Sequence, residues 1–168
     1  MIKIGVLTIS DKGSKGQRED KSGQVIRDSA PAMKGRVVKY EIVPDEKETI
    51  AARLRDWADG GEMDVILTTG GTGLAGRDVT PEATLSIIDR EVPGIAEAMR
   101  VKSLEKTPTA MLSRAVAGQR GKCLIVNLPG STRAVKECLE AIMPVLPHAV
   151  DIIRGKVTEH SLQDAGIN

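Results

Sequence analysis

Short apolar runs separated by polar and amphipathic segments form the main pattern along the chain. Residues 2–9, 64–69 and 122–128 are rich in Ile, Val and Leu and end at polar or turn-forming residues, whereas residues 36–43 alternate. Such runs predict strands, and strands that are apolar on both faces need cover on both sides. We therefore expect an α/β fold of three layers, with helices on both faces of a mostly parallel sheet.

The segments between these runs predict the helices. The clearest is 45–60, where Ile50, Leu54, Trp57 and Ala58 recur on one face. Residues 10–20, within the polar stretch 10–23, contain no apolar side chain, so a mobile surface loop is expected there. The other predicted helices are 21–33, 80–90, 94–105, a weakly patterned 110–117, and 131–143 with a restart or kink at Pro144 or Pro147 on the way to Arg154.

Three of these helix starts carry capping signals. Asp45 stands three residues before Glu48, which is the spacing of a capping box. Thr80 precedes Pro81, which suits the first helical position, and Ser131 precedes the helix that follows. We expect Asp45, Thr80 and Ser131 to be the N-caps.

The length and composition indicate one domain. The chain has 168 residues with no linker or repeat, so we expect a single domain over 1–168, with a core at about 2–154 and a polar tail at 155–168. It has no Phe, and only Trp57 and Tyr40 are aromatic, which argues against a base-stacking surface. The net charge of +1 also predicts no nucleic-acid partner.

The cysteines and apolar runs bear on the compartment. Cys123 and Cys138 fall in apolar patterns without the spacing of zinc ligands, so both are expected to be buried thiols. The N-terminus lacks the cleavage region of a signal peptide, and no apolar run approaches the length of a membrane span. We therefore expect a cytoplasmic protein with no membrane contact.

The most informative stretch is the glycine-rich segment at residues 68–82. It follows an apolar run, contains four glycines, and leads into a helix start. Glycine allows backbone N–H groups to face outward without interference from a Cβ atom, and the start of a helix favours negative charge. The segment therefore predicts an anion site, for which phosphate is the first candidate.

Two familiar phosphate-binding motifs fit this segment poorly. Residues 71–76 satisfy GxGxxG, but the helix begins too late and no strand ending in an acidic residue follows. The P-loop pattern fails because Arg77-Asp78 occupies the place of Lys and Ser or Thr. Neither a dinucleotide fold nor a P-loop enzyme is expected.

Unusual residues also follow the other predicted strands. They are Ser10-Asp11, Pro44-Asp45, and Leu128-Pro129-Gly130-Ser131. In an open α/β sheet the carboxyl ends of the strands line one edge, and ligands bind in the crevice there. We therefore expect these loops and the glycine-rich segment to meet at one site.

Together these residues resemble a known family. Thr68-Thr69-Gly70-Gly71-Thr72-Gly73, continued by residues 76–84, is similar to the signature of molybdopterin adenylyltransferases of the Mog type, which is shared with the gephyrin G domain. Ser10-Asp11, Pro44-Asp45 and Asn127-Leu128-Pro129-Gly130 agree with it in order. The resemblance spans about residues 3–154 and implies the three-layer fold of a molybdopterin-binding domain.

The resemblance implies an activity as well. Such proteins transfer AMP from ATP to the terminal phosphate of molybdopterin, release pyrophosphate, and prepare the pterin for molybdate insertion. They are typically trimers that need Mg²⁺, so a homotrimer and a hand-over to a molybdate-inserting partner are expected. Asp45 and Asp78 match the family's two essential acidic positions.

The expected site residues divide by role. Because the attacking phosphate is already anionic, the chemistry needs positioning and charge stabilisation more than a base, so Asp45 and Asp78 are assigned first as Mg²⁺-organising residues. Lys12, Lys15 and Arg18 are alternatives for closing over the triphosphate. The expected substrate-binding residues are Ser10, Asp11, Thr69, Gly70, Gly71, Thr72, Gly73, Arg77, Thr80, Ser113, Pro129, Gly130 and Ser131.

Other interpretations of these residues remain open from sequence. Asp45 alone suits a helix N-cap, and Asp78 suits a turn. At the level of function, the alternative is a relative of the same fold that binds pterin or nucleotide without turnover. A scaffold role of the gephyrin kind is less favoured, because no linker or second domain accompanies this segment.

Overall fold

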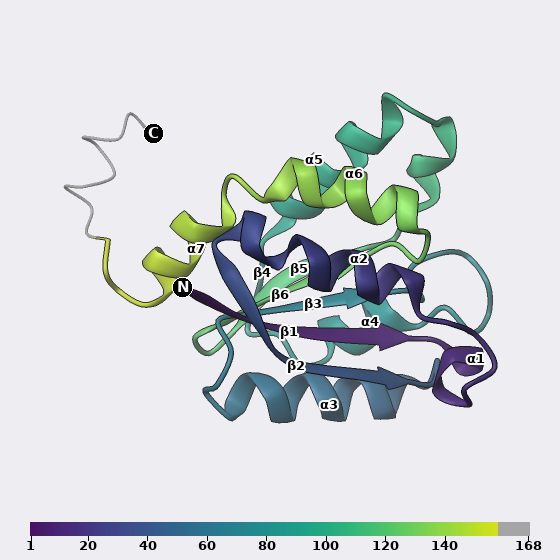
Figure 1. Ribbon diagram of the computed structural model, residues 1–168, viewed down its shortest axis with the longest axis horizontal. Coiled ribbons are helices and arrows are strands. Elements are labelled where there is room, and N and C mark those ends of the chain that lie inside the picture. Colours follow the sequence, from purple (N-terminus) through teal and green to yellow (C-terminus); the bar gives the residue numbers. More distant parts are fainter. Residues whose placement is uncertain (158–168) are drawn as a thin grey trace.

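The computed structural model describes residues 1–157 and shows one six-stranded sheet between two helical layers (Figure 1). The strands lie in the order β2-β1-β3-β6-β5-β4, in which β2, β1, β3 and β6 are parallel to one another, β5 is antiparallel to β6, and β4 is antiparallel to β5. The strands are β1 (Ile2–Ile9), β2 (Gly35–Val43), β3 (Val65–Thr69), β4 (Arg90–Glu91), β5 (Ala117–Arg120) and β6 (Cys123–Leu128).

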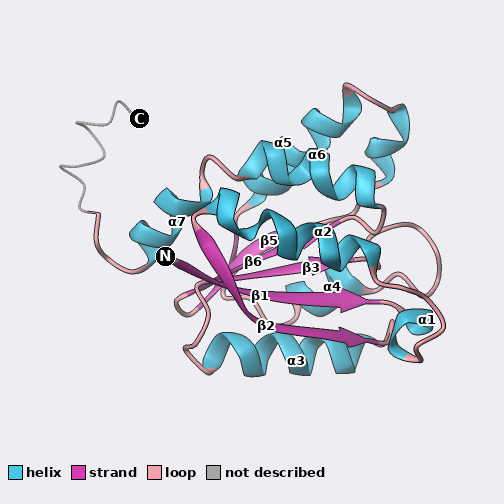
Figure 2. Ribbon diagram, in the orientation of Figure 1, coloured by secondary structure: helices cyan, strands magenta, loops and turns pink. Residues whose placement is uncertain are grey.

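The helices cover both faces of the sheet, as Figure 2 shows. Helices α2, α5 and α6 lie on one side, and α3 and α4 lie on the other. The helical elements are α1 (Asp11–Ser14), α2 (Lys21–Ser29), α3 (Lys47–Asp59), α4 (Thr80–Leu85), α5 (Pro93–Leu104), α6 (Thr132–Ile142), α7 (Leu146–Ile153), and the 3₁₀ helices η1 (Ala30–Met33) and η2 (Pro108–Leu112). The predicted three-layer α/β fold with a mostly parallel sheet is confirmed.

The alternation of side chains along the central strands builds two cores. In β3, Val65 and Leu67 pack under α2 and α6, whereas Ile66 packs against α3. Successive strand residues point to opposite faces, so an apolar run such as Val65-Ile66-Leu67 fills both layers. The same rule explains why these central strands could be recognised from composition alone.

Several predicted elements have different bounds. The helix expected over 80–90 ends at Leu85, and residues 90–91 form the edge strand β4. The helix expected over 110–117 is wrong, since η2 occupies 108–112 and β5 begins at Ala117. Strand β5 is short and carries Gln119 and Arg120 at the antiparallel side of the sheet, so it lacks the apolar run that marks the central strands.

The remaining differences lie at segment ends. The loop expected at 10–20 contains α1, whereas α2 begins at Lys21, as predicted. The expected helix 21–33 becomes 3₁₀ from Ala30, next to Pro31, and α7 is a separate helix after α6. Of the tail predicted at 155–168, residues 158–168 lie outside the described part of the chain.

Two further expectations can be compared with the described residues. Cys123 and Cys138 are buried, as predicted, and burial raises the pKa of the Cys123 thiol to about 12. Within residues 1–157, none of the helices has the length and apolar character required to cross a membrane.

Candidate functional site

The glycine loop, residues 70–79 between β3 and α4, leaves β3 in a conformation that side chains would prevent. Gly70 and Gly71 have φ values of 97° and 69°, in the left-handed region. A Cβ atom on Gly70 would overlap the carbonyl oxygen of Ile9, and one on Gly71 would clash with Thr80 Oγ1. Glycine is therefore required at both positions for the loop to lie this close to β1 and α4.

Thr80 supports this loop through two hydrogen bonds. It is fully buried, its hydroxyl donates to the Gly70 carbonyl at 2.9 Å, and its N–H donates to the Gly71 carbonyl at 3.1 Å. The predicted N-cap role is wrong, since Val79 is the N-cap of α4 and Thr80 is the first helical residue. Its hydroxyl holds the loop instead of capping the helix.

The loops expected at the carboxyl ends of the strands do meet, around a polar hollow of about 1090 Å³. Of the predicted site residues, this hollow is lined by Ser10, Asp11, Asp45, Thr69, Gly70, Gly71, Arg77, Asp78 and Gly130. Figure 1 shows the carboxyl ends of β1, β2 and β3 pointing to the same end of the molecule, beside α1. The predicted convergence is confirmed.

Asp11 and Asp45 are joined by reciprocal hydrogen bonds. Asp11 N–H donates to Asp45 Oδ2 at 2.8 Å, and Asp45 N–H donates to Asp11 Oδ1 at 3.0 Å. The capping box predicted at Asp45 is therefore wrong: Glu46 is the N-cap of α3, with no side-chain capping bond, and the Asp45 carboxylate serves the neighbouring loop. A contact between distant segments has replaced the local one.

Arg77 pairs directly with Asp11 and not with Asp45. Its Nε and Nη2 atoms donate to the two Asp11 carboxylate oxygens at 3.0 and 2.8 Å. The hydrogen bond from Arg77 lowers the pKa of Asp11, whereas burial, aided by the negative charges of Asp11 and Asp78, raises the pKa of Asp45. Its surroundings therefore disfavour the charged form of Asp45 relative to a solvent-exposed aspartate.

Asp78 completes the acidic side of the polar hollow. Its Oδ2 atom accepts from Ala75 N–H at 3.1 Å, so the turn role considered from sequence is present as well. A Cβ atom on Gly73 would lie only 2.8 Å from the same oxygen, which shows how closely loop and carboxylate approach. Asp78 is therefore held by the loop while facing the hollow.

The residues present fit a magnesium ion that is bound together with phosphate. Residues 1–157 contain no group of three or more His, Cys, Asp or Glu side chains arranged for a metal. Mg²⁺ in nucleotide sites is commonly held by one or two carboxylates plus substrate phosphates, with water completing the octahedron. Asp45 and Asp78, which face the same hollow, satisfy that requirement.

A second, apolar hollow of about 380 Å³ lies on the other side of the glycine loop. Ala96, Met99 and Leu112 contribute apolar surface, and the predicted site residues that line it are Thr72, Gly73, Ser113, Pro129 and Ser131. Ser131 is also the predicted N-cap of α6, since its Oγ accepts from Ala134 N–H at 3.2 Å. Thr80 lines neither hollow.

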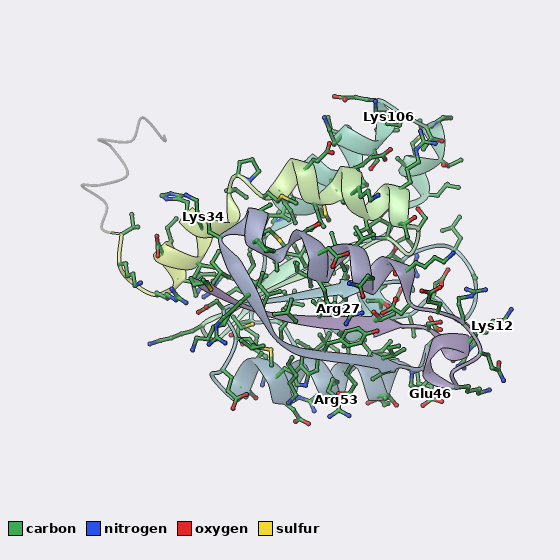
Figure 3. The ribbon with its side chains drawn as sticks, viewed as in Figure 1. Lys12, Arg27, Lys34, Glu46, Arg53 and Lys106 are labelled. Carbon is green, nitrogen blue, oxygen red and sulfur yellow. The ribbon has the colours of Figure 1, made fainter. Side chains whose placement is uncertain are left out.

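The structure narrows the choice among the basic residues and adds Asp20, which sequence reasoning missed. Lys12 and Arg18 line the polar hollow and Lys15 does not, which narrows the choice among basic residues; Figure 3 labels Lys12 on α1, with its side chain extending from that end of the molecule. Asp20 also lines the polar hollow and caps α2 through Gly23 N–H at 3.0 Å. Its place before an amphipathic segment was a usable capping signal.

Asn127 shows the opposite case, a motif residue with a structural role. It is fully buried, its amide donates to Thr68 Oγ1 at 3.1 Å and to Thr84 Oγ1 at 2.9 Å, and its Oδ1 accepts from Val116 N–H at 3.3 Å. These bonds join β6 to β3 and α4, so Asn127 stabilises the two elements that flank the glycine loop.

The fold and the hollows define a class: an α/β domain with a glycine-rich loop and acidic side chains at the carboxyl edge of a parallel sheet, beside an apolar hollow. Residues 5–148 match the family model described as a probable molybdopterin binding domain. The chain belongs to this family, and the resemblance inferred from the glycine loop is confirmed.

Individual relatives agree with this assignment. The chain is 46% identical over 167 residues to a molybdopterin adenylyltransferase of Helicobacter pylori, covering 96% of this chain and 95% of the relative. It is similar to the crystal structure of the molybdopterin biosynthesis enzyme MoaB from Thermus thermophilus, with a TM-score of 0.87, 54% identity, and coverage of 92% and 98% of the two chains. It is also 46% identical over 158 residues to the molybdenum cofactor synthesis protein cinnamon of Drosophila melanogaster, covering 94% of this chain but 26% of that protein.

Proposed function

We propose that the protein is a molybdopterin adenylyltransferase of molybdenum cofactor biosynthesis, which transfers AMP from ATP to the terminal phosphate of molybdopterin and releases pyrophosphate. The observation that carries this proposal is the similarity to the Helicobacter pylori adenylyltransferase over nearly the full length of both chains. The site supports it, because a phosphate cradle and two acidic side chains meet at the same edge.

The chemistry is a phosphate attack on phosphorus. An oxygen of the molybdopterin phosphate forms a bond to the α-phosphorus of ATP, the bond between that phosphorus and the bridging oxygen breaks, and the electron pair leaves with pyrophosphate. The nucleophile is already anionic, so no side chain has to remove a proton. The protein's task is to bring two anions together in the right geometry and to stabilise the developing charge.

The chain's own residues divide this task between the two hollows. The backbone of Gly70 and Gly71 forms part of the polar hollow that would receive phosphate, with Lys12 and Arg18 on its wall. The apolar hollow, with Met99 and Leu112, suits a flat heterocycle of one substrate. The glycine loop lies between them, so the reacting phosphates would meet beside it.

Magnesium is part of the proposal. Asp45 and Asp78 would hold Mg²⁺, which supplies positive charge that offsets the repulsion between the phosphate groups. Burial and neighbouring negative charge raise the pKa of Asp45. A bound cation would lower that pKa and stabilise the charged carboxylate, which supports this assignment.

Assembly and location extend the same proposal. By family resemblance, we expect a homotrimer in the cytoplasm. Because the related segment forms 26% of the longer cinnamon protein, we also expect hand-over of the adenylylated pterin to a molybdate-inserting partner. Size-exclusion chromatography with light scattering would test the trimer.

The direct test of function uses the purified full chain. ATP, Mg²⁺ and molybdopterin should yield adenylylated molybdopterin and an equal amount of pyrophosphate, and omission of either molybdopterin or Mg²⁺ should abolish both products. Absence of product at saturating substrates, together with measurable binding of molybdopterin or ATP, would favour the alternative of a binding protein without turnover.

A further inference from the structure

One arginine, which the sequence did not mark as a site residue, contacts the glycine loop at two points. Arg114 lies between η2 and β5, and its Nε atom donates to the Gly73 carbonyl at 2.7 Å. Its Nη2 atom donates to the Asp78 carbonyl at 2.7 Å, and its backbone N–H donates to the Thr72 carbonyl at 2.9 Å. A single side chain therefore ties the beginning of the 73–78 segment to its end.

The segment between these two contacts has little other support. Residues 74–77 are all exposed, and their contacts are the turn bonds between Ala75 and Asp78, at 2.9 Å from Asp78 N–H and 3.1 Å to Asp78 Oδ2, and the ion pair of Arg77 with Asp11. Exposed loops with few buried contacts open easily. The turn bonds with Ala75 fix Asp78 only within this exposed segment, so the position of the segment relative to the rest of the site depends on the bonds from Arg114.

Arg114 is itself fixed from two sides. Its Nη1 atom forms an ion pair with Glu82 of α4. The flanking backbone is held by Arg100 of α5, whose Nη1 atom donates to the carbonyls of Ser113 and Ala115 at 3.3 and 2.9 Å. Arg100 and Ser113 line the apolar hollow. Arg114 thus stands in a continuous set of contacts from the apolar hollow to Asp78.

We infer that Arg114 is a positioning residue for adenylyl transfer, which sets Asp78 and the glycine loop against the apolar hollow. This inference rests on the proposed function for its consequence in catalysis. The planar guanidinium offers several donors in a fixed arrangement, so it serves two carbonyls and a carboxylate at once, whereas the flexible Lys ammonium does not reproduce that geometry. Arg114 does not need to touch either substrate.

A matched control exists elsewhere in the chain. Arg120 of β5 also combines a carboxylate and a carbonyl: its Nε and Nη2 atoms donate to Asp59 at 2.8 and 2.9 Å, and its Nη1 atom donates to the Ile87 carbonyl at 2.6 Å. Arg120 lines neither hollow. Replacing it removes a similar set of bonds without altering the glycine loop.

The experiment compares Arg114→Gln, Arg114→Lys, Glu82→Gln and Arg120→Gln in the full chain. Turnover in Arg114→Gln should fall by about tenfold to a hundredfold, because small misplacements of reacting groups cost that much, and half-maximal rate should need more Mg²⁺. Arg114→Lys should recover only part of the rate. Glu82→Gln keeps both carbonyl bonds and should lose less than about threefold, and Arg120→Gln should keep the wild-type rate and Mg²⁺ dependence.

Hydrogen exchange of the backbone amides of residues 73–78 provides a readout that does not depend on activity. Exchange should become faster in Arg114→Gln and stay unchanged in Arg120→Gln. The two variants should be compared under conditions in which their free energies of unfolding are equal. An inactive wild-type protein would count against the proposed function alone. Unchanged exchange at 73–78 in Arg114→Gln, or turnover within twofold of wild type with the same Mg²⁺ dependence, would overturn the positioning role.

Discussion

Asp45 and Asp64 lie at opposite ends of the parallel strands, and their partners differ. Asp64, just before β3, accepts from Lys3 N–H at 2.8 Å and from Arg154 Nε at 2.9 Å. Burial alone would raise its pKa, but the bonds from Arg154 and Lys3 hold the pKa below the usual value. Asp45 accepts from Asp11 N–H, while the adjacent Arg77 pairs with Asp11, and burial raises the pKa of Asp45.

This difference assigns Asp64 to the stability of the fold and Asp45 to the functional site. At the amino end, a compensated aspartate fastens α7 to the sheet. At the carboxyl end, a carboxylate is kept near other negative groups with its charge only partly offset, an arrangement that costs stability and is typical of functional sites. Substitutions at the carboxyl end should therefore reduce turnover, and substitutions at the amino end should reduce stability.

The largest effect is expected for Asp45→Asn. Asparagine keeps the size and can still accept from Asp11 N–H, but it loses the charge that would hold Mg²⁺. Turnover should fall by about a hundredfold or more, in the range found when charge-stabilising groups are removed. The free energy of unfolding at pH 7 should be no lower than that of the wild type. A variant that is both active and less stable would assign Asp45 to the structural class.

Asp64→Asn should give the reverse result. It leaves Arg154 partly buried and without its carboxylate, and loss of one partner of such a pair is expected to cost about 2 kcal/mol. Urea unfolding would measure this loss. The rate of pyrophosphate release, measured below the unfolding transition, should stay within twofold of wild type; a large drop would mean that the amino end also serves catalysis.

The pH dependence of stability should differ in sign between the two positions. Because the folded pKa of Asp64 lies below its usual 3.8, its stabilising contribution is present above pH 3.8 and lost as the pH falls through the folded pKa. Because the folded pKa of Asp45 is raised, its contribution is complete below 3.8 and lost as the pH rises through the folded pKa.

Urea unfolding of both variants in the presence of a chelator, from pH 3 to 7, tests this contrast. The advantage of wild type over Asp64→Asn should shrink only at the acid end of the range. Any advantage of Asp45→Asn over wild type should be greatest near pH 7 and shrink as Asp45 becomes protonated. Parallel curves for the two variants would contradict the contrast.

The smallest effect is expected for Arg77→Gln, compared with Arg154→Gln. The Arg77 side chain is 62% exposed and that of Arg154 is 24% exposed. Loss of the exposed pair with Asp11 should change the free energy of unfolding by less than about 1 kcal/mol and should matter less in high salt. Arg154→Gln should cost more and depend less on salt. Equal losses with equal salt dependence would remove the distinction between the two ends.

The parts of the fold that could be predicted are those whose signals are local in the sequence. The central strands and the glycine loop were predictable, because apolar runs such as 65–67 and the glycine spacing at 70–73 are local features. Strands β4 and β5 were not, since they are short, partly polar, and formed only by pairing with a neighbour.

The same limit applies within the site. The convergence of four loops follows from sheet topology and was predicted correctly. The N-cap roles predicted for Asp45 and Thr80 were wrong, because their side-chain oxygens bond to groups that only folding brings close. These groups are Asp11 N–H for Asp45 and the Gly70 carbonyl for Thr80. The weak pattern at 110–117 gave no indication of the role of Arg114, since the partners of its side chain lie 32 to 41 residues away in the sequence.

The most direct test of the carboxyl-edge site is the rate of pyrophosphate release by Asp78→Asn beside wild type, with saturating ATP, Mg²⁺ and molybdopterin. Asparagine preserves the size of the side chain and can still accept from Ala75 N–H, so the turn should persist. If Asp78 organises Mg²⁺ and transition-state charge, the rate should fall by about a hundredfold or more without loss of stability. An unchanged rate would return Asp78 to a turn residue and contradict the assignment of the site.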